Sequence, residues 1–388
     1  MNDLRKNYNK LMSFSPPLIE KEEINEVVKT LKSGWITTGP KVKQFEKEFC
    51  RYIGCRYAIA LNSCTAGLFL ALLVGGIKKG DEVITTPYTF AATANVIIHL
   101  GAEPVFVDVD KKTFNIDPGK IEEKITKKTK AIIPVHFGGR PCEMDKILRI
   151  AKRHKLIVIE DAAHAVSAKY KNKKIGAISN FTAFSFHAVK NLTTAEGGML
   201  TTNNKQWSEK IRMLAYHGID KLTQNRESWR YKVIYPGYKF NMTDMAASLG
   251  LWQLRKLEKH YQTRLRLVKE YNSGLKKLSA ISIPNFKLNG RHSLHLYPIL
   301  LKDNYLKIKR DKFIMVLKEQ GIATNVHYFP LHLMPFYRKK FGYKSGDFPN
   351  AEYLYEREIT LPLHLQMKTN DVKYIVGKIK KITEKYQK

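Results

Sequence analysis

A lysine near the middle of the chain has neighbours that favour chemistry over a role on the surface. Lys190 follows the apolar residues 181–184 and precedes a Glu-Gly-Gly turn at 196–198. Upstream, an apolar run at 156–159 leads into the carboxylate of Asp161. A lysine amine that is uncharged part of the time can attack a carbonyl carbon, and with the aldehyde of pyridoxal phosphate it forms a Schiff base. This order of residues indicates an enzyme that uses pyridoxal phosphate.

The segment at 62–67 has the composition of a phosphate-binding turn. It contains Ser63 and Thr65, follows the short apolar run at 58–61 and precedes the apolar residues 68–74. Free backbone N–H groups at a helix start, with hydroxyls beside them and little side-chain bulk, attract a phosphate. An ordinary helix N-cap made by either hydroxyl is the alternative for this segment taken alone.

The carboxylate of Asp161 is the third element that the cofactor needs. An aspartate at a strand end can keep the pyridine nitrogen protonated, and the protonated ring then delocalises a carbanion formed on the substrate. A helix N-cap is an equal alternative for Asp161, and His164 and His187 could be buried histidines with satisfied partners. Lys190 alone could be a surface lysine. The order of phosphate turn, carboxylate and lysine on one alternating β/α pattern favours the cofactor site.

Further motifs link the chain to a known family. They are SGWITTGP at 33–40, EDAAH at 160–164, SFHAVKN at 185–191 and GYKFNMTD at 237–244. With these motifs the chain resembles the sugar aminotransferases of the DegT/DnrJ/EryC1/StrS type, from about Phe14 to the C-terminal helix. The resemblance implies pyridoxal phosphate enzymes of fold type I that act on nucleotide-linked keto-sugars.

The resemblance assigns cofactor roles to individual residues. Lys190 would carry the cofactor as an internal aldimine and later move the proton, and Asp161 would pair with the pyridine nitrogen. His164 would lie near the ring or its phenolic oxygen. Phe90 would stack on the ring, with a buried core aromatic as the alternative. The phosphate would be held by Ser63, Thr65, the Ala66 amide, Ser185 and, from the neighbouring subunit, Asn241. A homodimer with shared sites follows from the last of these.

The resemblance also implies the reaction. L-glutamate would donate the amino group, and the acceptor would be a UDP-linked 4-keto-6-deoxy sugar or 4-keto-pentose, because His187 replaces the tyrosine frequent in members that act at the 3-position. A sugar 3-dehydratase is a weaker alternative, since those members have histidine where this chain has Lys190. A non-catalytic regulator or polyanion binder is another. The expected substrate contacts are Trp35, Thr37, Thr38, His187, Arg230, Lys239, His327 and Tyr328.

Composition is compatible with this interpretation. The 388 residues include 67 basic and 35 acidic ones, a formal net charge of +32. The lysines are scattered and no nucleic-acid-binding motif accompanies them, so neither a nucleic acid nor a membrane is an expected partner. The positive field would attract anionic nucleotide-sugars. The four cysteines lack metal-ligand spacing, and the interval from Cys50 to Cys55 is too wide for a CxxC redox pair, so no metal is expected. No long apolar run is present, and a cytoplasmic enzyme is expected.

The elements that position these residues follow from apolar periodicity. Continuous apolar strands between helical stretches predict an α/β fold with a doubly wound, mainly parallel sheet covered on both faces, followed by a smaller α/β domain. The amphipathic stretch at 371–388 predicts a helix on the smaller domain. We expect an extension at 1–13, a large cofactor-binding domain at 14–255 and a small domain at 256–388. The strands are expected at 58–61, 82–85, 104–109, 131–135, 156–159 and 180–186, with another at 293–301.

Overall fold

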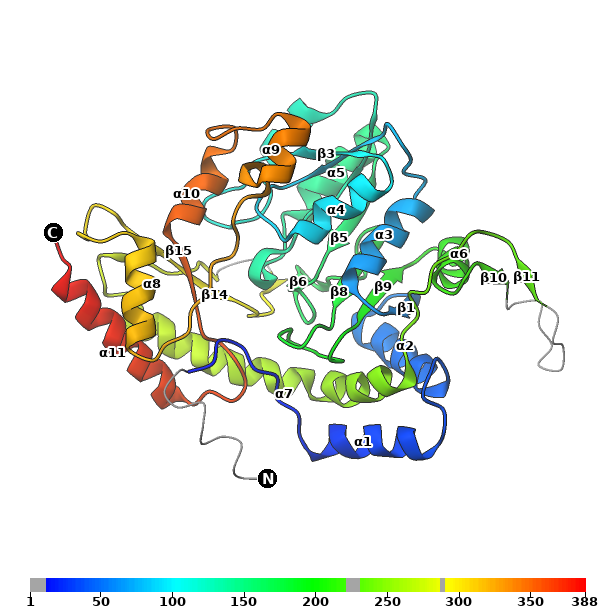
Figure 1. The fold of residues 1–388 in the computed structure, drawn as a ribbon, viewed down its shortest axis with the longest axis horizontal. Helices are drawn as coiled ribbons and strands as arrows, with labels where there is room; N and C mark the ends of the chain where they lie inside the picture. The colour runs from blue at the N-terminus through cyan, green and yellow to red at the C-terminus, as the bar shows by residue number, and fades with distance from the viewer. Residues whose placement is uncertain (1–11, 221–230, 287–289) are drawn as a thin grey trace.

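A seven-stranded sheet forms the centre of the larger part of the molecule (Figure 1). This computed structural model describes residues 12–220, 231–286 and 290–388. The strand order is β1-β9-β8-β5-β4-β2-β3; β9 runs antiparallel to both its neighbours and the other pairs are parallel. The strands are β1 (Tyr57–Leu61), β2 (Glu82–Thr85), β3 (Glu103–Phe106), β4 (Thr129–Ile132), β5 (Ile157–Asp161), β8 (Phe181–Ser185) and β9 (Gly198–Thr202).

Helices cover both faces of this sheet, which explains its uninterrupted apolar strands. In β1, Ile59 and Leu61 join the core formed with α3 and α6, whereas Ala58 and Ala60 join the core formed with α2 and α7. The predicted doubly wound, mainly parallel sheet is therefore confirmed. The helices around it are α2 (Pro40–Ile53), α3 (Cys64–Val74), α4 (Ala91–His99), α5 (Met144–His154), α6 (Lys205–Ala215) and α7 (Asp244–Leu275).

A second core lies at the C-terminal half of α7. There α11 (Thr369–Lys385) buries Val372, Ile375, Ile379 and Ile382, spaced as one face of a helix. The proposed domain border at residue 255 falls inside α7 and stays a prediction. Within the described ranges, no helix is both long and apolar enough to span a membrane. The other elements of this part are β12 (Ile281–Ser282), β14 (Tyr297–Leu301), β15 (Glu358–Leu361), α8 (Arg310–Glu319), α9 (Pro335–Phe341) and α10 (Pro349–Arg357).

Small antiparallel pairings complete the fold. A three-stranded sheet has the order β13-β6-β7, and a two-stranded one is formed by β10 and β11. The sheet β12-β14-β15 is antiparallel throughout, and its last strand borders the functional site described below. The bounds of the short strands are β6 (Lys169–Tyr170), β7 (Lys173–Lys174), β10 (Ile219–Asp220), β11 (Lys232–Val233) and β13 (Gly290–Arg291).

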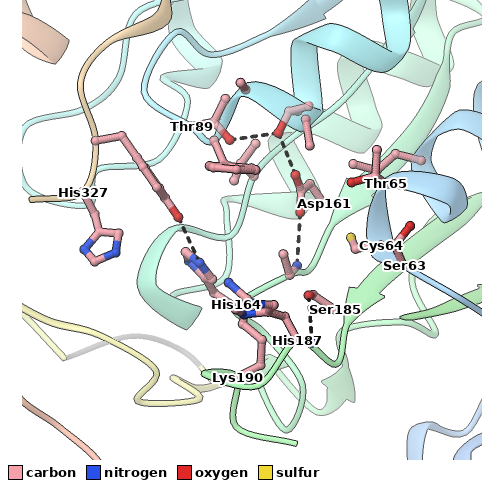
Figure 2. Close-up of a pocket in the computed structure, with 18 of the residues that line it drawn as sticks. Ser63, Cys64, Thr65, Thr89, Asp161, His164, Ser185, His187, Lys190 and His327 are labelled. Atoms are coloured by element: carbon pink, nitrogen blue, oxygen red, sulfur yellow. Dashed lines mark hydrogen bonds between the residues drawn. The ribbon is translucent and has the colours of Figure 1, made fainter. Parts of the chain in front are cut away.

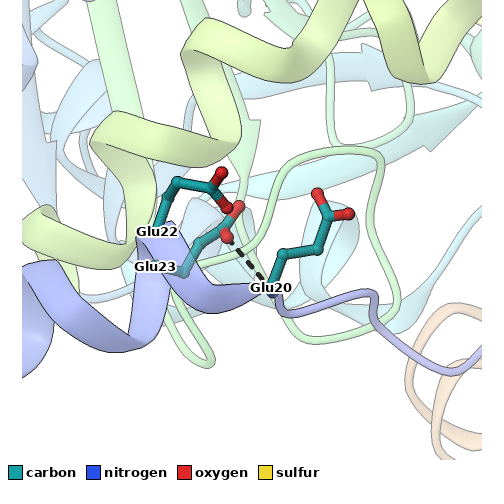
Figure 3. A group of neighbouring side chains, drawn as sticks. All are labelled: Glu20, Glu22 and Glu23. Atoms are coloured by element: carbon teal, nitrogen blue, oxygen red, sulfur yellow. Dashed lines mark hydrogen bonds between the residues drawn. The ribbon is translucent and has the colours of Figure 1, made fainter.

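Three glutamates attach the N-terminal helix α1 (Lys21–Lys32) to α7 (Figure 3). Lys256 Nζ of α7 donates to Glu20 at 2.9 Å, to Glu22 at 2.9 Å and to Glu23 at 2.8 Å. Burial lowers the pKa of Lys256, but these hydrogen bonds outweigh burial and the net shift is upward. The carboxylates are close enough to resemble a metal site. Because one ammonium group contacts all three, we interpret the cluster as a clamp between helices.

The turn after α2 brings the thiols of Cys50 and Cys55 close together. Gly54 has φ +84°, and its N–H donates to the carbonyl of Cys50 at 2.8 Å. In this type of helix ending, the residue after the left-handed glycine packs on the residue four positions before the glycine. Cys55 Sγ therefore lies 3.8 Å from Cys50 Sγ. Both cysteines are free thiols.

Candidate active site

A cavity of about 630 Å³ lies at the carboxyl ends of β5 and β8, between the large sheet and the segment that follows α8 (Figure 2). Ligand sites in open α/β sheets occupy this edge. Segments far apart in the sequence contribute to its wall, because parallel strands end at the same edge of the sheet. The predicted residues that line it are Ser63, Thr65, Phe90, Asp161, His164, Ser185, His187, Lys190, His327 and Tyr328.

Lys190 lies in a turn after β8, where its N–H donates to the His187 carbonyl at 2.9 Å. Burial lowers the pKa of Lys190 to about 8, because an ammonium group is poorly solvated in the cavity, although Asp161 opposes this shift. Cys64 beside it is a neutral thiol, since burial raises its pKa well above the usual value. Lys190 therefore supplies a neutral amine to the cavity much more readily than a surface lysine does.

Asp161, at the end of β5, has a buried carboxyl group with two intramolecular donors. Thr93 Oγ1 donates to Oδ2 at 2.8 Å, and the Ala163 N–H donates to Oδ1 at 3.1 Å. Thr89 Oγ1 lies 2.9 Å from Thr93 Oγ1 and extends this chain of hydroxyl groups. Burial raises the pKa of Asp161, and the two hydrogen bonds and Lys190 only partly offset that effect. A cationic group beside the carboxyl would favour its ionised form.

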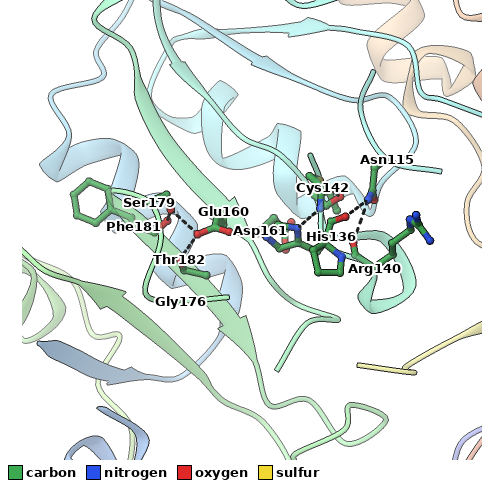
Figure 4. A network of polar contacts seen from close by, with 12 residues as sticks. Asn115, His136, Arg140, Cys142, Glu160, Asp161, Gly176, Ser179, Phe181 and Thr182 are labelled. Atoms are coloured by element: carbon green, nitrogen blue, oxygen red, sulfur yellow. Dashed lines mark hydrogen bonds and ion pairs between the residues drawn. The ribbon is translucent and has the colours of Figure 1, made fainter. Parts of the chain in front are cut away.

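A buried network behind β5 fixes the position of this strand end (Figure 4). Glu160 accepts a hydrogen bond from Thr182 at 2.9 Å and lies 2.9 Å from His136 Nε2. His136 Nδ1 accepts the Cys142 N–H at 3.0 Å, so the ring proton is on Nε2 and points to Glu160. The His136 N–H in turn donates to the Asp161 carbonyl at 3.1 Å. Glu160 therefore serves the scaffold, and Asp161 faces the cavity.

The tautomer of His164 follows from its two partners. Its Nδ1 accepts the Gly138 N–H at 3.2 Å, and its Nε2 lies 3.1 Å from the Tyr328 hydroxyl. Burial holds the pKa of His164 well below its ordinary value, so the ring is neutral and the proton is on Nε2. Nε2–H donates to Tyr328, which leaves the proton of the Tyr328 hydroxyl available to a ligand in the cavity.

The predicted phosphate turn forms the N-terminus of α3, and Ser63 is its N-cap. Ser63 Oγ accepts the Ala66 N–H at 3.0 Å, so the N-cap alternative holds for this pair. The first-turn amides of Cys64 and Thr65 have no acceptor within a helix and point to the helix start, where an anion is favoured. A Cβ on Gly198 would lie 2.4 Å from the Ser63 carbonyl carbon. Glycine at position 198 therefore allows β9 to approach the N-terminus of α3 closely.

Phe90 is at the rim of the cavity. Its side chain is 64% exposed, which excludes the core-aromatic alternative, and its ring centroid lies 6.4 Å from that of Tyr328. An exposed aromatic ring above a cavity can cover a planar ligand. Together with an amine, a carboxylate and an anion seat, Phe90 completes a set of residues that fits pyridoxal phosphate.

Five predicted residues of the described chain lie away from this cavity. Asn241 Nδ2 donates to Thr38 Oγ1 at 2.6 Å, and within the described chain its buried Oδ1 has no hydrogen-bond partner. Thr37 accepts the Asp244 N–H at 2.7 Å through its carbonyl, and Trp35 is 62% exposed. Lys239 Nζ lies 4.5 Å from the ring centroid of Tyr216. Arg230 lies outside the described residues.

The structure adds residues that motif matching missed. Thr93 and Gly138 contact Asp161 and His164 directly, and Glu358 with Thr360 supports His327 from β15. Thr93 could have been suspected because it is polar in the otherwise apolar start of α4. The other three belong to segments whose approach to the cavity depends on packing between distant parts of the chain.

Comparison with known proteins identifies the family. The model of the DegT/DnrJ/EryC1/StrS aminotransferase family matches residues 17–380. The chain belongs to this family. It is 49% identical to SpsC of Bacillus subtilis, a spore coat polysaccharide biosynthesis protein, over 97% of this chain and 98% of SpsC.

Solved structures of family members agree with this assignment. The putative sugar aminotransferase Spr1654 of Streptococcus pneumoniae, in its PLP form, has a TM-score of 0.91 at 39% identity over 97% of this chain and 99% of its own. PseC of Helicobacter pylori, an aminotransferase involved in pseudoaminic acid biosynthesis, also has a TM-score of 0.91, at 31% identity over 97% and 100%. The family member described here is a pyridoxal phosphate-dependent aminotransferase, as the motifs predicted.

Proposed function

We propose that the enzyme transfers the amino group of L-glutamate to a nucleotide-linked keto-sugar, with a UDP-linked 4-keto-6-deoxy sugar or 4-keto-pentose as the preferred acceptor. The observation that carries this proposal is that one cavity contains the buried Lys190 amine, the carboxyl group of Asp161 and the N-terminus of α3, where an anion is favoured. His187, His327 and Tyr328 also line this cavity and would contact the sugar. SpsC and PseC, which serve polysaccharide and pseudoaminic acid biosynthesis, support a sugar substrate.

The residues of the cavity divide the work of holding the cofactor. Bound pyridoxal phosphate would supply an electron sink for a carbanion on the substrate. Asp161 would keep the ring nitrogen protonated, and Phe90 would cover the ring. The N-terminus of α3 with the Thr65 hydroxyl, together with Ser185, would hold the phosphate.

Lys190 would attach the cofactor and then act as the proton carrier. Once an incoming amine has displaced it, the neutral Nζ can take a proton from the substrate carbon and return it to a neighbouring position. Its lowered pKa supports this role, since a lysine that stays fully protonated at neutral pH has no lone pair to use. The same residue argues against the 3-dehydratase alternative, whose members have histidine there.

We further propose that two subunits share each site. Asn241 lies outside the cavity of its own chain, and its buried Oδ1 has no hydrogen-bond partner among the described residues. A residue that serves the phosphate of a neighbouring subunit would have this geometry. Trp35, Thr37, Thr38 and Lys239 would then belong to the wall of the partner's cavity. The net charge of +32 would draw in anionic nucleotide-sugars. A cytoplasmic location stays a prediction.

The two half-reactions test the proposal separately. Purified holoenzyme should lose its cofactor absorbance band on addition of L-glutamate, and a suitable keto-sugar should restore it. UDP-, dTDP- and GDP-linked 4-keto-sugars should be compared with 3-keto isomers in the second step. Faster recovery with a 3-keto-sugar would overturn the regiochemical assignment, and a glutamate response without recovery on any nucleotide-keto-sugar would overturn the substrate class.

A further inference from the structure

A buried carboxyl group is connected to the cavity through a threonine and a histidine. Glu358 and Thr360 are two residues apart in β15, so their side chains lie on the same face of the strand. Thr360 Oγ1 is hydrogen-bonded to Glu358 Oε1 and lies 2.9 Å from His327 Nδ1. The backbone of Asn325 pairs with that of Thr360 and fixes the register between the two segments. The chain of atoms is continuous from Glu358 to the ring of His327.

Of the two oxygens of Glu358 and the two ring nitrogens of His327, one of each is free to change its hydrogen-bonding role. The His327 N–H donates to Glu358 Oε2 at 2.8 Å, so that oxygen always has to be an acceptor. His327 Nε2 makes no hydrogen bond within the described residues. The residue lines both this cavity and an adjoining pocket of about 50 Å³ that it shares with Lys190 and Tyr328, so Nε2 is the nitrogen left for a ligand. The hydrogen-bonding role can therefore change at Glu358 Oε1 and at His327 Nε2, the two ends of the connection.

Glu358 can change its protonation state near neutral pH, whereas the His327 ring stays neutral there and can only exchange one tautomer for the other. Burial raises the pKa of Glu358 to about 8, against the hydrogen bonds from Thr360 and His327. Burial, helped by Lys190, lowers the pKa of His327 to about 4, so its ring stays neutral. The other charged or titratable groups that face Glu358 are Arg310 of α8, Tyr88 and Tyr328.

Hydrogen-bond direction then allows two arrangements. When Glu358 is ionised, Thr360 donates to it and accepts from His327 Nδ1–H, which leaves Nε2 as an acceptor. When Glu358 carries a proton on Oε1, it donates to Thr360, and Thr360 donates to Nδ1, which places the ring proton on Nε2. One proton on Glu358 thus reverses the hydrogen-bonding character of the ring nitrogen at the cavity.

We propose that Glu358, Thr360 and His327 form a proton wire that ends in the cavity, and that the proton on Glu358 decides whether His327 Nε2 donates to a sugar oxygen or accepts from a sugar hydroxyl. In the donating direction Nε2 gives its proton to the substrate, Nδ1 takes the proton of Thr360, and Thr360 takes the proton of Glu358. Three N–H or O–H bonds break and three form, and Glu358 is left ionised. No electron is transferred.

This assignment rests on the proposed function for its chemical purpose. Amination of a keto-sugar removes the carbonyl oxygen as water, and that oxygen needs protons as it leaves. The glutamate half-reaction releases its keto acid without a sugar in the cavity. The wire is therefore expected to serve the sugar step, with His327 as the contacting residue and Glu358 and Thr360 as positioning residues.

The wire can be tested on the holoenzyme by nuclear magnetic resonance of ¹⁵N-histidine-labelled protein, with His327→Gln to assign the signals. The proton of His327 should move from Nε2 to Nδ1 as the pH rises through the titration of Glu358, near 8. In Glu358→Gln, the amide oxygen must accept the backbone N–H of His327, so the NH2 group faces Thr360. The ring should then keep its proton on Nε2 at every pH at which it is neutral. Thr360→Val should uncouple the tautomer from Glu358, and Thr360→Ser should retain the coupling.

Kinetics supply the second measurement. Thr360→Val should slow the single-turnover sugar step on the order of 10- to 100-fold, near the lower limit for loss of acid–base assistance, with the glutamate step unchanged and Thr360→Ser close to the parent enzyme. A tautomer that ignores both pH and Glu358→Gln would overturn the wire, as would equal slowing of both half-reactions. The tautomer measurement needs no sugar, so its result stands even if the proposed substrate class is wrong. If Glu358→Gln fails to fold, the valine and serine variants decide alone.

Discussion

At the scale of single residues, burial determines which groups can react. Lys190 and Asp161 face the same cavity, and burial shifts both pKa values toward the neutral forms. Glu160 is next to Asp161 in the sequence but points to the opposite face of β5, where three protein donors occupy it. Strand alternation and the low polarity of the cavity therefore distinguish the proposed reactive pair from its neighbours.

Lys190 in the cofactor-free protein should titrate near pH 8. Its pKa is lowered because burial disfavours the ammonium form, so the amine becomes reactive as the pH rises through about 8, well below the range of surface lysines. The measurement is the pH dependence of modification by an amine-reactive reagent, with peptide mapping. Lys190→Arg tests the role in turnover. This variant should fold and hold the phosphate group of the cofactor but show no turnover, because a guanidinium group does not lose its proton. Normal turnover in Lys190→Arg would refute the proton-carrier role.

At the scale of secondary-structure elements, the backbone conformation at the end of a helix affects stability. Gly54 ends α2 in the left-handed region with open space around its Cα, so backbone strain alone should decide the effect of a side chain. Gly54→Ala should lower the free energy of unfolding by about 1 kcal/mol. Gly377 in α11 also has open space but ordinary helical geometry, and Gly377→Ala should raise stability by about 0.5–1 kcal/mol. Urea denaturation of both variants provides the comparison, and equal signs would contradict this account.

The contribution to stability of the clamp between α1 and α7 can be tested by removing the charge of Lys256. Lys256→Met would leave the buried carboxylate of Glu23 without its cation, although Gln253 still donates to it at 3.0 Å. We expect a loss of about 1–3 kcal/mol in the free energy of unfolding. Lys259→Met removes an exposed charge from the same helix and should be nearly neutral. Thermal denaturation measures both, and an unchanged melting temperature for Lys256→Met would show that the clamp contributes nothing to stability.

At the scale of the whole molecule, the shared-site proposal predicts complementation between subunits. Lys190→Ala and Asn241→Ala should each abolish or greatly reduce turnover. If Asn241 serves the partner's cavity, a mixed dimer has one site with both defects and one site with neither. Mixing the two inactive proteins under conditions that exchange subunits should therefore restore part of the activity in a steady-state assay. If mass spectrometry shows that heterodimers have formed but no activity returns, Asn241 contributes to the site of its own chain.

Much of this organisation could be predicted from the sequence. Strands such as β2 are found at the expected residues, and others are displaced by a few positions at their ends. The antiparallel strand β9 was missed, because its short run at 198–202 begins with glycine and two of its five residues are threonine. Asp161 is the last residue of β5, the turn at Ser63 follows β1, and Lys190 lies in the turn after β8, so local sequence was enough to identify them as candidates.

The sequence by itself indicated most of the strands and helices, the candidate reactive amine and the family, because these depend on periodicity and on motifs contiguous in the chain. Only the tertiary structure decided which residues meet across long separations. Tyr328 contacts His164 from 164 positions away, and Glu358 reaches His327 from a strand of the second sheet. Such contacts depend on how elements from distant parts of the chain pack together, and neighbouring residues in a sequence carry no direct record of that geometry.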